Sequence, residues 1–277
     1  MTRRLMICKN VQPGAAEFIT SMGSASTTSI NIDGTNVGDQ TFPYVLIPWV
    51  VPVGVTEIDA FMVGPGGAGY RSASSGNPPA GAGGFTKTYK RNNITVDAGG
   101  WIKDGGAITV TQGETIYILL GIIATINGGN STRLLRLQSG NNYTNIVPQA
   151  IYGAHPPTTS SAGSGGSGGS RGNNQNGGSD GSNGSGTGAG TGQGHTTRPF
   201  AEDGKWAVDL NLSLMMYVPF AGGGGGHGNS VGGYFGGGGT ANNGVNNYGG
   251  GGGAYPGSPS GLYNLGGTGC VVLRWGF

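Results

Sequence analysis

The stretch AGGGGGHGNSVGGYFGGGG, residues 221–239, decides how this chain folds, because its glycine runs are longer than those of an ordinary loop. Ordering one backbone residue costs roughly 1–2 kcal/mol of conformational entropy, and glycine loses the most. The chain nevertheless continues into CVVLRW, residues 270–275, which is apolar and β-branched like a buried strand. We therefore expect the glycine tracts to be held between β elements at both ends, and not to form a free tail.

A three-residue period runs through the preceding glycine tract. Ser164, Ser167 and Ser170 are separated from one another by pairs of glycines. Three residues per turn is the period of polyproline II, whose backbone has no internal hydrogen bonds, so only residues without side chains let neighbouring rods pair with it. The pattern predicts a bundle of polyglycine II rods, each of about eight to ten residues and roughly 25–30 Å long. The glycine spacing changes to two between Gly184 and Gly194, which excludes collagen.

The first half of the chain has the pattern of an all-β fold. Residues 44–51 and 55–63 are apolar or alternating and flank a Pro-Val-Gly turn, which predicts a two-stranded unit. We expect a β-sandwich or jelly-roll-like base with little α-helix, since only residues 15–22 have weak helical periodicity. Further strands are expected at 84–89, 94–97, 107–110 and 115–126.

Composition excludes several classes of protein. Of 277 residues only 9% are charged and the net charge is +2, without a basic run, which argues against a nucleic-acid binder. No run of 18 apolar residues is present, so membrane insertion is not expected. The apolar stretch in the start MTRRLMICKN is too short for a signal peptide, which predicts synthesis in the cytoplasm without export. Cys8 and Cys270 are expected to be free thiols.

Motifs that suggest catalysis lack their structural context. Gly64-x-Gly66-x-x-Gly69 follows a predicted strand, but a Ser/Pro-rich loop replaces the helix of a dinucleotide site. The G-x-S-x-G matches arise from the GGS repeat, and the three histidines have no partner at metal-ligand spacing. Glu202 and Asp203 are adjacent on a predicted loop, where paired acids are usually solvated. We expect no catalytic residues, no cofactor and no metal, and so no enzyme.

Aromatic residues among the glycines form the candidate recognition set. Aromatic rings give a large contact area for little side-chain entropy, and loops on a rigid frame are common recognition surfaces. The alternative is that the rings cover the glycine edges of the bundle by packing, and both interpretations stay open. A similar case holds for the loop 127–145, whose Arg133, Arg136 and Tyr143 could meet acidic sugars or a neighbouring subunit. The candidate receptor-binding residues are His227, Tyr234, Phe235, Tyr248, Tyr255 and Tyr263, with Tyr70 and Arg71 in a second loop.

Four stretches of the sequence resemble glycine-rich adhesins at bacteriophage tail-fibre tips. VPVGVTEIDAFMVGPGGAG (51–69) and GAGGFTKTYK (81–90) resemble the entry strands of that family, and GGTGCVVLRWG (266–276) its closing strand. GGSDGSNGSGTGAGTGQGHTTRPF (177–200), followed by residues 221–239, resembles its glycine tracts. Glycine-rich extracellular domains of animal receptor kinases resemble the same architecture. The resemblance covers residue 42 to the C-terminus and implies a β base carrying polyglycine II rods whose end loops contact a host surface.

Three domains follow from the composition change and the extent of the resemblance. Residues 1–41 are expected to be an N-terminal attachment segment and 42–150 a β-sandwich-like domain. Residues 151–277 are expected to be the polyglycine II region, with an inserted strand at 205–220 and the closing strand at 270–275.

The function expected from this resemblance is that of a non-enzymatic phage virion protein, at the tail fibre or tail tip, that binds the bacterial surface. Its expected partners are other tail or fibre proteins, through the N-terminal part, and a host surface glycan or outer protein. The expected assembly is a monomer or a homotrimer. The alternative is a structural virion protein, such as a decoration, connector or spacer, without receptor binding. A third class, an ice-binding or bacterial surface glycine-rich protein, is disfavoured because no flat threonine-rich face is evident.

Overall fold

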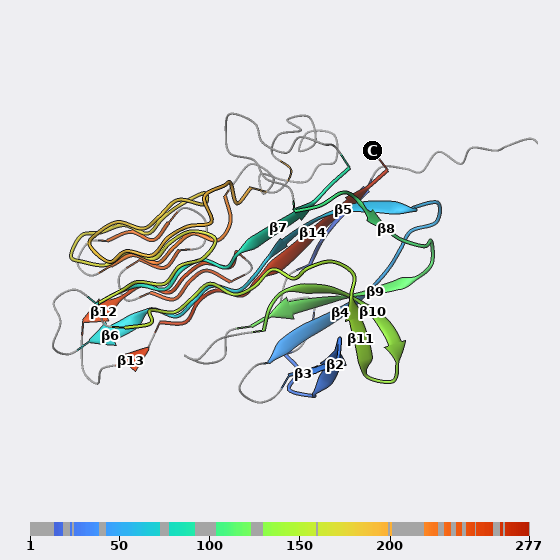
Figure 1. The fold of residues 1–277 in the computed structure, drawn as a ribbon, viewed down its shortest axis with the longest axis horizontal. Coiled ribbons are helices and arrows are strands. Elements are labelled where there is room, and N and C mark those ends of the chain that lie inside the picture. Colours follow the sequence, from blue (N-terminus) through green and yellow to red (C-terminus); the bar gives the residue numbers. More distant parts are fainter. Residues whose placement is uncertain are drawn as a thin grey trace, which may run out of the picture.

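The described part of the molecule is built from β-strands and extended glycine-rich rods (Figure 1). Within that part every regular element is a strand and none is a helix, so the predicted all-β fold is confirmed. The weak helical candidate at 15–22 was wrong where it is described, because Gly14–Phe18 form strand β1. The computed structural model describes residues 14–18, 23, 25–38, 43–72, 78–91, 104–122, 130–158, 160–198, 200, 219–226, 230–233, 237–239, 242–246, 248–256, 261–262 and 264–276.

Two sheets form the base of the molecule. The first has the order β1–β14–β5–β7, with β8 also paired to β5, and the second has the order β3–β2–β11–β10–β9–β4. The strands of the first sheet are β1 (Gly14–Phe18), β5 (Glu57–Val63), β7 (Thr86–Tyr89), β8 (Ile108–Thr109) and β14 (Cys270–Trp275). Those of the second are β2 (Ile30–Ile32), β3 (Thr35–Val37), β4 (Tyr44–Val50), β9 (Thr115–Gly121), β10 (Arg133–Ser139) and β11 (Asn142–Asn145).

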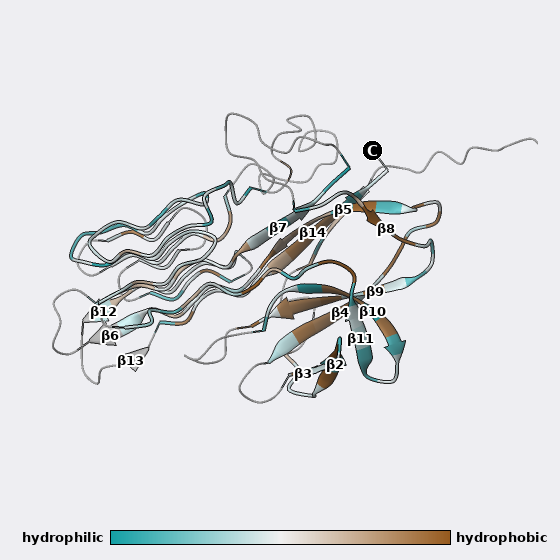
Figure 2. Cartoon of the chain, in the orientation of Figure 1, coloured by the Kyte–Doolittle hydropathy of each residue, from teal (hydrophilic) through white to brown (hydrophobic). Residues whose placement is uncertain are grey.

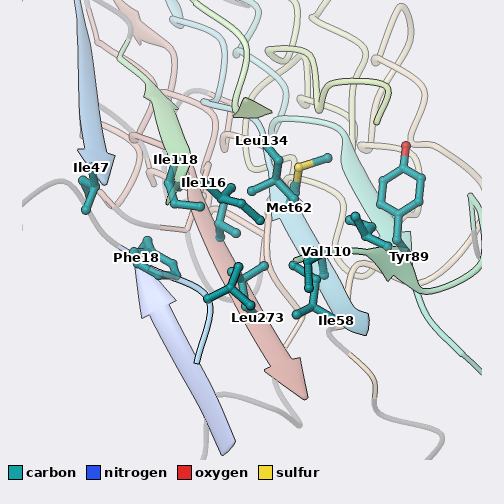
Figure 3. Close-up of a cluster of buried hydrophobic side chains, with 14 of the residues drawn as sticks. Phe18, Ile47, Ile58, Met62, Tyr89, Val110, Ile116, Ile118, Leu134 and Leu273 are labelled. Carbon is teal, nitrogen blue, oxygen red and sulfur yellow. The ribbon is translucent and has the colours of Figure 1, made fainter. Parts of the chain in front are cut away.

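The two sheets share one hydrophobic core, as a sandwich does. Successive side chains of a strand point to opposite faces, so Ile58 and Met62 of β5 meet Ile116 and Ile118 of β9 between the sheets (Figure 3). The intervening Phe61 points the other way, into a second cluster on the outer face of the first sheet. Apolar residues are concentrated in these base strands, and the rods are paler (Figure 2).

The second sheet curls around a third cluster. Leu119 and Tyr44 point away from the shared core and pack with Ile30 and Ile32 of β2. The curl is closed by Ser26, which exchanges two backbone hydrogen bonds with Tyr44, at 2.7 and 3.1 Å. Both faces of the central strands are therefore buried.

The prediction that residues 44–51 and 55–63 form a two-stranded unit was wrong. Strand β4 pairs with β9 and β5 pairs with β14, so the two segments lie in different sheets. The Val51 amide donates to the carbonyl of Glu114 at 2.9 Å, which holds the end of β4 on its own sheet while the chain crosses over. The crossing lets both strands bury their apolar faces in the same core. The expected strand at 94–97 lies outside the described residues.

Three strands of the first sheet continue directly into the glycine rods. Strand β5 leads into residues 64–69, residues 79–85 lead into β7, and residues 264–269 lead into β14. The neighbour order is preserved, since the Gly66 amide donates to Gly267 at 2.8 Å and the Gly67 amide donates to Ala82 at 2.7 Å. The bundle is thus a hydrogen-bonded extension of the base (Figure 1).

Residues 79–85 form a rod whose backbone is bonded to six neighbouring segments. Its amides point in three directions that repeat every third residue, as three residues per turn require. Those of 80 and 83 donate to residues 167–170, those of 81 and 84 to 249–252, and those of 82 and 85 to 151–154, at 2.8–3.1 Å. Its carbonyls accept from three further segments, 64–70, 163–166 and Gly224. This hydrogen-bond pattern is that of a polyglycine II bundle.

Close approach of backbones explains the glycines of the bundle. A Cβ atom at Gly83 would fall on the carbonyl of Ala221, and one at Gly81 on the carbonyl of Gly67. The backbone at both positions lies outside the left-handed region, so space, and not conformational freedom, requires glycine there. The rods are shorter than predicted, because the chain turns back after residue 166 and the Gly169 amide donates to Gly163. The GGS repeat therefore spans two rods and not one.

The structural parts differ from the predicted domains. Strand β1 pairs with β14, and β2 pairs with β11, so segments before residue 42 complete both sheets of the base. Residues 64–69 and 79–85 belong to the bundle although they precede residue 150. The expected inserted strand at 205–220 lies outside the described residues except for its last two positions.

Candidate recognition surface

A small three-stranded sheet lies at the end of the rods furthest from the base (Figure 1). Strand β6 (Tyr70–Ser72) is central, β12 (Tyr255–Pro256) is parallel to it and β13 (Gly261–Leu262) is antiparallel. Arg71 stands opposite Tyr255 and Gly261, and Tyr70 stands opposite Leu262. The structure thus brings together three predicted site residues, Tyr70, Arg71 and Tyr255, which are far apart in the sequence.

The rods position this sheet. Residues 64–69 carry the chain out from β5 to β6, and residues 249–254 carry it out to β12. The Tyr70 amide donates to the carbonyl of Pro79 at 2.9 Å, which ties the sheet to the rod that returns to the base. The side chains of Tyr70 and Tyr255 are half-buried, so part of each ring is accessible.

Three turns lie beside the sheet, and Arg171 joins the second of them to the third. Their described residues are 155–158 with 160–161, 172–175, and 185–188. Arg171 forms a β-bridge with Pro79, its amide donates to Ser185 at 3.0 Å and its Nη1 donates to the Thr187 carbonyl at 2.9 Å. Asn174 has a φ of 56°, a left-handed conformation that asparagine tolerates in tight turns. We call these turns, together with Arg171, β6, β12 and β13, the tip surface.

The tip surface combines aromatic, amide, hydroxyl and basic residues. Arg171 contributes a basic side chain, and the described positions of the tip surface include no aspartate or glutamate. Tyrosine offers a flat apolar ring with a hydroxyl, and asparagine, serine and threonine offer adaptable hydrogen bonds. Such a surface can bind polar, hydroxyl-rich or anionic partners.

Tyr248 lies in a different environment from the other described candidates. Its ring centroid is 5.4 Å from that of Phe220, beside the buried cluster that includes Phe61 and Cys270. Burial raises the pKa of its hydroxyl. We therefore leave Tyr248 out of the tip surface. The candidates His227, Tyr234, Phe235 and Tyr263 lie outside the described residues.

Polar side chains within the glycine tracts replace missing backbone partners, a role that the sequence did not suggest. The Asn243 side-chain oxygen accepts from the Leu265 amide at 2.9 Å, and that of Asn246 accepts from the Thr268 amide at 3.4 Å. Both partners are spaced by three residues, the repeat of the rods. In the sequence, the pattern that could have predicted this capping is an asparagine or serine at every third residue.

The other candidate positions are used in the base. Arg136 forms an ion pair with Glu114 at 3.0 Å, Tyr143 is buried in the third cluster, and Arg133 lines a pocket considered below. Cys270 is a free, buried thiol, and desolvation raises its pKa well above the ordinary value. Among the described residues, no three metal-ligating side chains converge, and no helix is long and apolar enough to cross a membrane.

A family model described as a glycine-rich domain matches residues 40–276. The chain belongs to this glycine-rich domain family. The match covers β4 to β14, hence most of the base and all the described rods of the glycine-rich domain, while β1–β3 precede it. Neither a curated protein nor a solved structure matches the chain.

Proposed function

We propose that this glycine-rich domain is a non-enzymatic component of a phage virion, at the tail fibre or tail tip, that binds the bacterial surface. The tip surface carries the proposal: aromatic and hydrogen-bonding residues from distant parts of the chain meet at the far end of a bundle anchored in the base. The resemblance of residues 42–277 to tail-fibre tip adhesins supplies the virion context. Several copies per virion would raise avidity over weak single-site binding.

A rigid frame favours this use of the tip. The rod 79–85 is bonded on six sides, so the tip strands are held with little freedom relative to the base. Preorganised loops lose less entropy on binding than flexible ones. The rods would therefore position the tip, and the tip would make the contact.

The test measures binding of the purified protein to intact cells of a candidate host. The double variant Tyr70→Ala/Tyr255→Ala is expected to lose saturable binding while its circular dichroism is unchanged. Tyr152→Ala is the matched control, because Tyr152 is exposed and lies on residues 151–154, level with the base end of the rods. Binding that survives the double variant would contradict the tip assignment, and removal of surface polysaccharide or outer proteins would name the receptor class.

The predicted role of Tyr234 and Phe235 is tested separately with Tyr234→Ala/Phe235→Ala. Loss of binding by this folded variant alone would place the contact on residues 227–236 instead of the tip surface.

The second candidate is a structural virion protein that connects or decorates. The dense hydrogen bonding of the rods suits a spacer as well as a recognition frame. Immunogold labelling of intact particles separates the two, since a connector would lie inside the tail or on the shell and a receptor-binding protein at the free end of a fibre.

A further inference from the structure

A pocket of about 750 Å³ lies in the base, where strands β2, β10 and β11 of the second sheet have one of their ends. Asp33 and Thr35 at the turn between β2 and β3 form one side, the start of β10 contributes Arg133, and Asn145 at the end of β11 forms the other side with residues 146–149. Strands β2 and β3 lie far from β6, β12 and β13, so the pocket is separate from the tip surface (Figure 1). Its size is within the range of small-molecule sites.

The pocket wall carries a fixed carboxylate. Asp33 accepts hydrogen bonds from Thr144 Oγ1 at 2.7 Å, from Asn145 Nδ2 at 2.7 Å and from the Asn145 amide at 3.3 Å. These bonds hold the pKa of Asp33 below its usual value, so the group is ionised at neutral pH. Asp33 itself remains exposed to the pocket mouth.

The remaining polar wall has unused hydrogen-bonding capacity. Arg133 Nε, Asn145 Oδ1 and Gln149 Oε1 are buried and have no hydrogen-bond partner among the described residues. Buried polar atoms nearly always have partners, so three such atoms around one pocket call for an explanation. Neighbouring protein atoms cover them, so a guest would pair with these atoms only after the side chains around them rotate.

The chemistry of the wall is both polar and apolar. Arg133 and Asp33 are the ionisable lining residues, so their charges balance. The guanidinium donates, the carboxylate and the two amide oxygens accept, and Val147 and Pro148 provide an apolar surface. A neutral ring with hydroxyl groups on its edge and C–H groups on its face matches that combination.

We propose that this pocket binds a neutral saccharide unit, with ring hydroxyls paired to Arg133, Asn145 and Gln149 and a ring face on Val147 and Pro148. The site goes beyond the tip surface and does not depend on it. A saccharide bound in the base would give the protein a second contact with a glycan coat.

The experiment titrates the purified chain with glucose, galactose and N-acetylglucosamine, and with glucuronic acid as the anionic comparison. Binding is measured by isothermal titration calorimetry or saturation-transfer NMR. At least one neutral sugar is expected to bind with millimolar or tighter affinity. Gln149→Met and Arg133→Met are each expected to weaken it by about tenfold or more, because a polar pairing is lost in each. Gln138→Met is the matched control, since Gln138 is exposed on β10 outside the pocket and its variant should bind like the parent.

Thr35→Trp is a second test of the site, and it leaves the core intact. Thr35 is exposed at the pocket rim, and an indole there should block entry and abolish binding. Binding that is unaffected by Thr35→Trp, a parent chain that binds no sugar, or binding of glucuronic acid alone would each overturn the proposal. The Tyr70→Ala/Tyr255→Ala variant should keep full saccharide binding, which separates this site from the tip.

Discussion

Asp59 and Arg274 stand opposite each other on β5 and β14, and Arg274 Nε donates to Asp59 Oδ2 at 2.9 Å with side-chain exposures of 2% for Arg274 and 6% for Asp59. The other carboxylate oxygen accepts from the Arg91 amide at 2.9 Å, and the guanidinium lies 4.0 Å from the centre of the Phe200 ring. The pair therefore ties the closing strand to the entry strand on the outer face of the first sheet, where the Phe200 ring covers it.

Removing one partner of this pair is expected to destabilise the fold strongly. Arg274→Met should lower the free energy of unfolding by about 3–5 kcal/mol, because the Asp59 carboxylate would be left buried and uncompensated. Urea unfolding followed by tryptophan fluorescence measures the change. Arg136→Met is the control: its ion pair with Glu114 is partly exposed, with side-chain exposures of 38% and 21%, so its loss should cost clearly less than the loss of the Arg274 pair. Equal losses in the two variants would contradict the argument.

The cost of a glycine-to-alanine substitution is expected to differ between a closely packed glycine of the bundle and a glycine with open space around it. Gly83→Ala should lower the free energy of unfolding by about 1–3 kcal/mol, because the new Cβ would collide with the Ala221 carbonyl and push two rods apart. Gly106→Ala should change it by less than about 0.5 kcal/mol, since a Cβ there meets no atom within 4 Å. Melting temperatures of the two variants give the comparison, and a tolerated Gly83→Ala would argue against the rod packing.

Cys270 is expected to resist thiol reagents while the protein is folded. Its side chain is fully buried and desolvation raises its pKa, so little thiolate is present to react. In a Cys8→Ser variant, Ellman's reagent should label no thiol under native conditions and one thiol per chain in urea. Rapid native labelling would show that the β14 region opens readily.

Glu17 is expected to make stability depend on pH. Desolvation raises the pKa of this β1 carboxyl group in the folded state, so the folded form binds its proton more tightly than the unfolded form. The contribution of Glu17 is therefore most favourable at low pH and is lost as the pH rises through the folded pKa. Glu17→Gln should be more stable than the parent at pH 7, and the difference should shrink near pH 4. Urea unfolding at the two pH values measures this, and a constant difference would contradict it.

The residues of the tip surface were only partly predictable. Tyr70, Arg71 and Tyr255 were identifiable as polar or aromatic residues close to glycine runs, and the structure places them in one small sheet. Tyr248 has the same local sequence character, yet its ring packs on Phe220 near the base. Local composition does not distinguish the two environments, because Tyr70, Tyr248 and Tyr255 all lie beside glycine runs. The Asp33 and Arg133 pocket had no local signal, since its walls come from segments about a hundred residues apart.

By itself the sequence determined the all-β class, the positions of β4, β5, β7 and β9, and the presence of glycine rods with a three-residue repeat. The alternation of apolar and polar residues and the absence of side chains can both be read from a short stretch of sequence. The pairing of rods was decided by the tertiary structure. A glycine backbone presents the same amide and carbonyl at every position, so nothing in a glycine tract specifies its neighbour. The neighbours of residues 79–85 are fixed by β5, β7 and β14, because these strands continue into the rods from a sheet whose pairing is specified by its side chains.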